Sequence, residues 1–95
     1  MILHKFSASP FSQSNLISVL ARVEPHDGIL LVEDAVYGLT SKLILEPILQ
    51  RSSKVYALNS DCIARGVECA EKIITQIDYS GFVALTLEYD NVISW

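Results

Sequence analysis

The chain contains few of the residues that usually form catalytic or metal sites. Its 95 residues include two cysteines, two histidines and four glycines. Cys62 and Cys69 are too far apart for a C-x-x-C redox pair, and His4 and His26 are remote from both, so no zinc-binding spacing is present. The four glycines are scattered along the chain, which excludes a G-x-G-x-x-G dinucleotide motif and a Walker loop.

Positive charge is also scarce. Seven Lys and Arg residues stand against eleven Asp and Glu residues, and the formal net charge is −4. No two basic residues are adjacent, and the stretch from Asp78 to Trp95 holds three acids and no base. Proteins that grip nucleic acids usually carry a basic patch or stripe. We therefore expect no direct binding of RNA or DNA by this chain.

Long hydrophobic runs are missing as well. The most apolar stretch begins with four aliphatic residues, Ile29 to Val32, whereas a membrane span needs about 18. His4 and Lys5 stand where a signal peptide would have its apolar core, so we expect a cytoplasmic protein. Apolar residues, by contrast, are abundant and make up 51% of the chain. This is enough for the core of one domain over residues 1–95, with apolar surface left for a partner.

Short apolar runs alternate with segments of helical periodicity. Strands are predicted over residues 2–6, 28–33, 54–59 and 73–75, and residues 92–94 are predicted to form a fifth strand or an extended tail. Helices are predicted from Ser9 and Pro10 through Leu16, Ile17, Leu20 and Val23, over 40–50, from Ser60 to Gly66, and from Asp78 onward, with a turn over 34–38. This alternation predicts an α/β fold: a flavodoxin-like open parallel sheet of about five strands with helices on both faces. Pro47 should leave the second helix short or kinked.

Ligands of such sheets bind beyond the carboxyl ends of the strands, which places residues 6–9, 33–34, 59–62 and 75–78 at the expected site. Ser7, Ser9, Ser12 and Ser14 follow the first strand and could hold the phosphate of a flavin or another ligand. Helix capping explains the serines better, because the loop has no glycine and Pro10 lacks an amide donor. Glu33 and Asp34 follow the second strand and could bind magnesium, although solvated charge or capping explains this pair more simply.

Cys62 is the strongest nucleophile candidate. It falls in the first turn of the helix after the third strand, where the helix dipole lowers the pKa of a thiol. The alternative, which we favour, is that Cys62 packs on the sheet and is inert. Cys69 lies beside Glu68 and Glu71, whose charge would raise its pKa. His4 is predicted to be a partly buried histidine with satisfied hydrogen bonds, and His26 to lie in a turn.

The ordered set of local motifs resembles one small family. The matching segments are Leu3-His4, Ser9-Pro10-Phe11, the run from Leu30 to Tyr37, the run from Val55 to Asp61 with Ala64-Arg65-Gly66, Asp78-Tyr79 with Phe82-Val83, and the terminal Trp95. Together they resemble the DsrH/TusB family over essentially the whole chain. That resemblance implies a DsrEFH-like fold and no cofactor.

The resemblance also implies partners and a pathway. Members of this family belong to a cytoplasmic TusBCD-type assembly, a heterohexamer with two copies each of this chain and of TusC- and TusD-like subunits. The assembly passes persulfide sulfur to a TusE-like acceptor, for the 2-thio group of the modified wobble uridine of tRNA. The sister subunit's sulfur-carrying cysteine aligns near Leu58, and a cysteine that some relatives carry in the first helix aligns near Val19.

Because neither position holds a cysteine, the resemblance implies a structural, non-catalytic subunit. Two alternatives remain open: a persulfide carrier that uses Cys62, and a flavin- or phosphate-binding module. The large aromatic residues Tyr37, Tyr79 and Phe82 are predicted at or near subunit contacts, since such side chains often anchor interfaces. We also expect the chain to become stable only with its partners.

Overall fold

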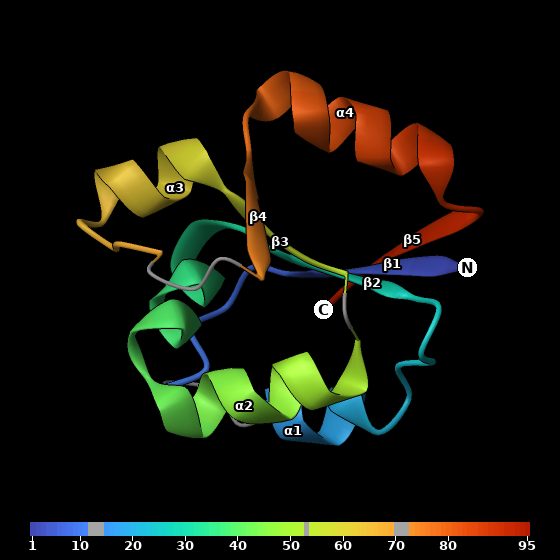
Figure 1. The fold of residues 1–95 in the computed structure, drawn as a ribbon, viewed down its shortest axis with the longest axis horizontal. Coiled ribbons are helices and arrows are strands. Elements are labelled where there is room, and N and C mark those ends of the chain that lie inside the picture. Colours follow the sequence, from blue (N-terminus) through green and yellow to red (C-terminus); the bar gives the residue numbers. More distant parts are fainter. Residues whose placement is uncertain (12–14, 53, 70–72) are drawn as a thin grey trace.

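A five-stranded, all-parallel sheet forms the centre of the molecule, a computed structural model that describes residues 1–11, 15–52, 54–69 and 73–95 (Figure 1). The strands lie in the order β4-β3-β2-β1-β5. Their bounds are β1 Ile2–Phe6, β2 Gly28–Leu31, β3 Val55–Leu58, β4 Ile74–Ile77 and β5 Asn91–Ser94. The predicted class, an open parallel α/β sheet of five strands, is confirmed.

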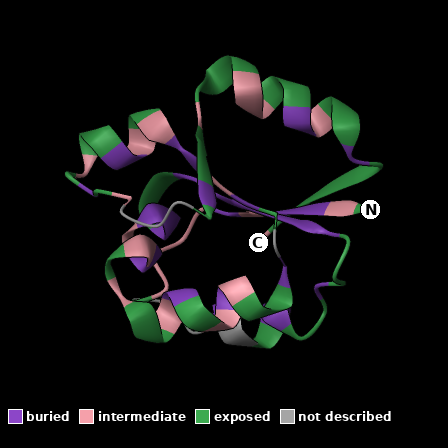
Figure 2. Ribbon diagram, in the orientation of Figure 1, coloured by how far each residue is buried: buried purple, intermediate pink, exposed green. Residues whose placement is uncertain are grey.

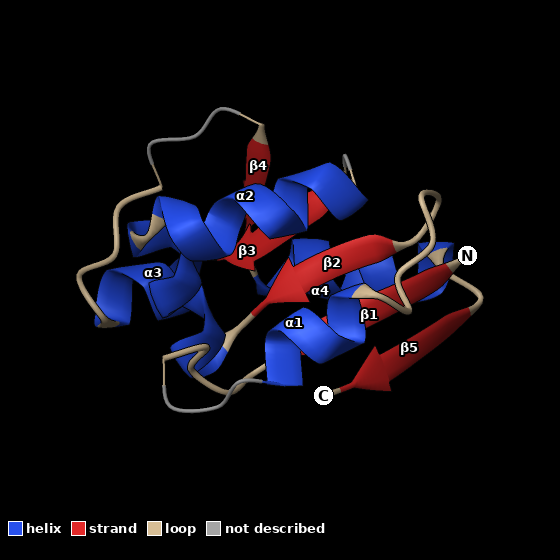
Figure 3. Cartoon of the chain, turned by 90° about the horizontal axis from the view of Figure 1, so that it is seen from below, coloured by secondary structure: helices blue, strands red, loops and turns tan. Residues whose placement is uncertain are grey.

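The strand order follows from the direction in which the chain winds. From β1 it adds β2, β3 and β4 on one side, and then returns to place β5 against the other edge of β1 (Figure 3). Flavodoxin itself has the order 2-1-3-4-5, so here the reversal lies at β1 and β5. Because parallel crossovers are right-handed, connections that run in opposite directions along the sheet lie on opposite faces.

The helices are distributed unevenly over the two faces for this reason. They are α1 Asn15–Leu20, the 3-10 helix η1 Glu33–Thr40, α2 Lys42–Arg51, α3 Asn59–Ala64 and α4 Tyr79–Glu88. Side chains of α1, η1, α2 and α3 share one buried cluster with one face of the sheet. The return helix α4 packs on the other face, on its own side of the sheet in Figure 1.

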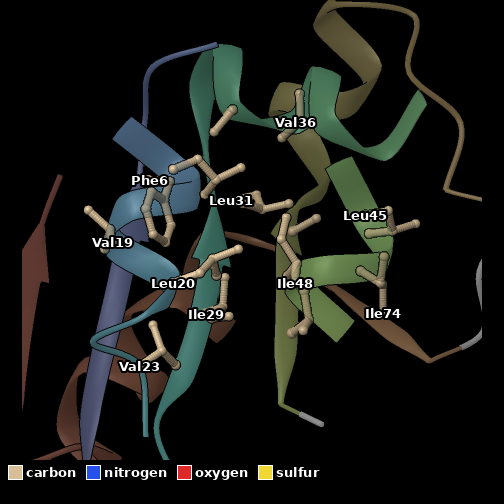
Figure 4. Close-up of a cluster of buried hydrophobic side chains, with 14 of the residues drawn as sticks. Phe6, Val19, Leu20, Val23, Ile29, Leu31, Val36, Leu45, Ile48 and Ile74 are labelled. Carbon is tan, nitrogen blue, oxygen red and sulfur yellow. The ribbon is translucent and has the colours of Figure 1, made fainter. Parts of the chain in front are cut away.

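The larger cluster is built from alternate strand residues. Ile29 and Leu31 of β2 point to it together with Phe6 of β1, and α2 contributes Ile48, which is completely buried (Figure 4). Leu30, between them in sequence, is also completely buried but belongs to the cluster under α4. A strand that is buried on both faces is typical of the middle of a parallel sheet, as the sequence predicted for this segment.

Several local predictions differ from the structure. The turn expected over 34–38 is the longer helix η1, and the fourth strand lies at 74–77 instead of 73–75. Ser9 and Pro10 lie in a turn before α1, where the Ser9 hydroxyl accepts the Phe11 amide at 3.2 Å. Ser60 lies inside α3 and does not cap it, since the N-cap is Leu58. The predicted start of the last helix at Asp78 is confirmed, and the Asp78 side chain caps α4 by accepting the Gly81 amide.

Pro47 lies inside α2, the helix that the sequence predicts to be short or kinked. It is the sixth residue of the ten-residue helix α2, which continues to Arg51. Leu45, two residues before Pro47, and Ile48, directly after it, are both buried.

Among the described helices, none is both long and apolar enough to cross a bilayer.

Candidate functional site

The polar residues predicted beyond the carboxyl ends of β2 and β3 meet in the structure. Asp61 of α3 accepts a hydrogen bond from the backbone amide of Glu33, with 2.7 Å between Oδ2 and N. Glu33 has a φ of 50°, a left-handed conformation that is uncommon for a residue other than glycine. The hydrogen bond from the Glu33 amide to Asp61 thus ties the strained start of η1, which follows β2, to α3, which follows the neighbouring strand β3.

Arg65 neutralises the acidic residues at this edge. Its Nε donates to Asp34 Oδ1 at 2.9 Å, and its Nη1 lies 3.6 Å from Asp61 Oδ1. The hydrogen bond to Asp34 and the nearby carboxylates raise the pKa of Arg65. The magnesium hypothesis for Glu33 and Asp34 therefore gains no support, and no group of three metal-binding side chains occurs among the residues that the structure describes.

Sequence reasoning overlooked this role of Arg65. The i, i+4 spacing of Asp61 and Arg65 was a usable signal, because residues at that spacing lie on one face of a helix. The contact with Asp34, 31 residues away, was not visible in any local pattern.

Cys62 lies in the first turn of α3, as expected, but its side chain points into the core. It is 1% exposed and belongs to the larger apolar cluster, against which the half-buried Cys69 also packs. Burial raises the pKa of the Cys62 thiol, and the nearby Cys69 and Asp61 raise it further, against a hydrogen bond from Gln76 and the charge of Arg65. A buried thiol with a raised pKa is a poor nucleophile at neutral pH.

The end of β3, where the family resemblance implies the sulfur-carrying cysteine of a sister subunit, has no thiol in this chain. Leu58 occupies this position and is 8% exposed. Beside it an open pocket of about 550 Å³ is lined by Asn59, Gln76, Ile77, Asp78 and Gly81. Amide and carboxylate groups therefore surround the place where a sulfur carrier would have its nucleophile.

The other sequence candidates are separate from this edge or only partly described. Ser12 and Ser14 of the serine-rich loop, and Glu71 beside Cys69, lie outside the described residues. His26 is exposed between the first helix and β2, in the turn where it was predicted.

His4 belongs to a buried network that joins distant parts of the chain. Its Nε2 lies 3.0 Å from Asp27 Oδ2, and the indole Nε1 of Trp95 donates to its Nδ1 at 3.1 Å. Asp27 also accepts the backbone amides of Ile2 and Glu24. Burial by itself raises the pKa of Asp27, but the bonds to His4 and to the two amides outweigh it and lower the pKa. His4 is thus more deeply buried than predicted, and both ring nitrogens have partners.

The three predicted interface aromatics do not share one surface. Tyr79 is 70% exposed at the start of α4, and its ring meets that of Phe82 edge to face with 5.8 Å between centroids. Phe82 is partly buried against the cluster under α4. Tyr37, in η1, packs against the larger cluster on the other face of the sheet.

Comparison with known proteins settles the family. A family model described as "DsrH like protein" matches residues 8–92. Protein TusB of Escherichia coli (strain SMS-3-5 / SECEC) is 34% identical over 96 residues, covering 99% of this chain and all of that protein. The chain belongs to the DsrH/TusB family. A second member, Protein TusB of Buchnera aphidicola subsp. Baizongia pistaciae (strain Bp), is 32% identical with the same coverage.

The fold of this DsrH/TusB family member also matches a solved structure. The crystal structure of the ychN protein from E. coli superimposes with a TM-score of 0.77, over 99% of this chain and 97% of that one. The two sequences are 16% identical, so this likeness concerns the fold alone.

Proposed function

We propose that this chain is a non-catalytic subunit of a TusBCD-type sulfur relay in the cytoplasm. In this proposal it assembles with TusC- and TusD-like subunits, two copies of each, and the complex passes sulfur to a TusE-like acceptor for 2-thiolation of the modified wobble uridine of tRNA. Full-length similarity to proteins named TusB supports the pathway. The main observation in favour of a non-catalytic role is that Cys62 is buried.

A sulfur carrier needs a thiolate that both its donor and its acceptor can reach. The terminal sulfur of a persulfide is transferred by attack of another thiolate, so the carrier must be accessible and largely ionised. Cys62 fails on both counts, because it is 1% exposed and its pKa is raised. Leu58, at the position of the sister subunit's cysteine, has no sulfur to offer. The chain therefore supports a relay through its structure, while the partner subunits carry the sulfur.

The test of the proposal is co-expression with the TusC- and TusD-like proteins of the same genome. An affinity tag on this chain should retain both partners, and native mass spectrometry should give a complex with two copies of each subunit. The isolated chain should melt at a lower temperature than the complex, since partner binding stabilises the folded state by mass action. Failure of the tagged chain to retain either partner would contradict the proposal.

A further inference from the structure

The outer face of α4 is apolar although it points to solvent. Tyr79, Val83 and Leu87 recur every four residues, a spacing that places them on one stripe of a helix. They are 70%, 46% and 82% exposed. The opposite side of the helix is the one that packs on the sheet, through Leu85 and Phe82. Figure 2 shows the contrast along α4, which is mostly exposed, with intermediate positions and with Leu85 as its buried residue.

This composition is unusual for a helix at the surface. Among the ten residues of α4 only Glu88 is charged. By comparison, α2 covers the other face of the sheet and carries Lys42, Glu46 and Arg51, with Leu43 as an isolated exposed apolar residue. A surface helix normally has polar and charged residues on its outer side, and a helix that is apolar all round is normally buried. The sequence of α4 therefore fits a helix that becomes covered.

The charges near the exposed stripe of Tyr79, Val83 and Leu87 indicate what kind of partner would cover it. Asp78 precedes α4 and Glu88 ends it, whereas no Lys or Arg occurs between Asp78 and Trp95. Asp90, which follows, is paired with the terminal amine at 2.7 Å. Lys5 places its ammonium group 5.8 Å from the Phe82 ring, and that ring faces the sheet side of the helix. The exposed stripe is thus flanked by negative charge at both ends.

A second copy of the same helix would be a poor partner. In an antiparallel pairing of two α4 helices, Asp78 of one copy would approach Glu88 of the other, and in a parallel pairing each acid would approach its own counterpart. Like charges at a contact disfavour it, while complementary charges favour and orient it. The flanking acids therefore favour a different protein, with basic residues on either side of an apolar surface.

We propose that the stripe formed by Tyr79, Val83 and Leu87 is the docking surface for a neighbouring subunit whose apolar contact face is flanked by Lys or Arg residues. This inference rests on the proposed function, in that the neighbouring subunit is one of the relay partners. Tyr79, with its ring fixed edge to face against Phe82, is the anchor residue of the surface.

The test compares two leucines of nearly equal exposure on opposite faces of the sheet. Leu87 on α4 is 82% exposed and Leu43 on α2 is 86% exposed. Tagged wild type, Leu87→Asp and Leu43→Asp are each co-expressed with the TusC- and TusD-like subunits, and binding is titrated with the purified chains. Leu87→Asp should weaken binding by about tenfold or more, as expected for an interface core position. Leu43→Asp should stay within about twofold of wild type. Circular dichroism should show both variants folded.

A second pair of variants tests the charge argument. Glu88→Lys should weaken binding by about threefold, and should change its salt dependence, because a charge at the rim of an interface acts mainly through steering and complementarity. Glu46→Lys, an exposed acid on α2, serves as the matched control and should have no effect.

The outcomes separate this inference from the proposed function. Retention of both partners by wild type and equally by Leu87→Asp would overturn the docking surface and leave the relay complex intact. A wild-type chain that retains no partner would overturn both proposals. A pure wild-type chain that forms a dimer by itself, which Leu87→Asp but not Leu43→Asp dissociates, would show that a second copy covers the stripe and would overturn the choice of a different, basic partner.

Discussion

The last residue of the chain is hydrogen-bonded to its fourth: Trp95 Nε1 donates to His4 Nδ1 at 3.1 Å. Because Nδ1 accepts this bond, the proton of the neutral ring lies on Nε2, which faces Asp27 Oδ2 at 3.0 Å. The arrangement ties the residue that follows β5 to the neighbouring strand β1. It also explains why Asp27, in a turn that looks unremarkable in the sequence, is 4% exposed and fully bonded.

Replacement of Asp27 by Asn should destabilise the fold by about 2 kcal/mol at pH 7, because the amide cannot accept all the donors that now face the carboxylate. The pKa of Asp27 is lowered from 3.8, so the folded state binds fewer protons than the unfolded state. Its contribution is therefore complete above pH 3.8 and is lost as the pH falls toward the folded pKa.

Urea unfolding of wild type and Asp27→Asn between pH 7 and pH 3 measures this effect. The difference in unfolding free energy between the two proteins should shrink as the pH falls below 3.8. Asp90→Asn is the control, since Asp90 is exposed and its carboxylate pairs with the terminal amine. It should change stability by less than about 0.5 kcal/mol. A difference for Asp27→Asn that stays constant down to pH 3 would refute the linkage.

Gly28 is required by a close approach of Tyr89. A Cβ atom at position 28 would clash with the Tyr89 hydroxyl oxygen and would lie 2.7 Å from its Cζ. Gly28→Ala should therefore cost about 2 kcal/mol through overpacking. In a Tyr89→Leu background, where the phenol is missing, the added cost of Gly28→Ala should fall below about 0.5 kcal/mol. Equal costs in both backgrounds, measured by chemical denaturation, would mean that the Tyr89 contact is not the cause.

The two cysteines should differ in reactivity in the folded chain. Cys62 is 1% exposed with a raised pKa, whereas Cys69 is half-buried. Iodoacetamide at pH 8 should modify Cys62 at least about tenfold more slowly than Cys69, because the thiolate is the reactive species and must be reached. Peptide mass spectrometry over time gives both modification rates. In urea, which unfolds the chain, the rates of Cys62 and Cys69 should become similar. Similar rates in the native protein would restore Cys62 as a candidate sulfur carrier.

The sequence predicted those features that depend on local pattern. The aliphatic run at 29–32 indicated a strand buried on both faces, and Asp78 with Tyr79 indicated the start of α4, as the structure has them. The features that were missed depend on residues far apart in the chain. Asp27 is 23 residues from His4, and the partner of the Glu33 amide is 28 residues away. The periodicity of apolar residues along the chain gives no information about such long-range contacts.

The strand order illustrates the same limit. Strand and helix alternation predicts a parallel sheet, but it does not say on which side of β1 the fifth strand pairs. That choice is made by the face on which α4 packs, and the apolar character of α4 on all sides hides which of its faces is the inner one. Only the packing of Leu85 and Tyr89 against Leu3 and Leu30 identifies it.

In the proposed relay, this chain is needed for tRNA 2-thiolation but carries no sulfur itself. The most direct measurement is the content of 2-thiouridine in tRNA, by liquid chromatography and mass spectrometry, in a strain that lacks this chain. The nucleoside should be lost in that strain, and should be restored both by wild type and by the double variant Cys62→Ser, Cys69→Ser. An unchanged content after deletion would contradict the claim, and so would a double variant that assembles with its partners but restores no 2-thiouridine.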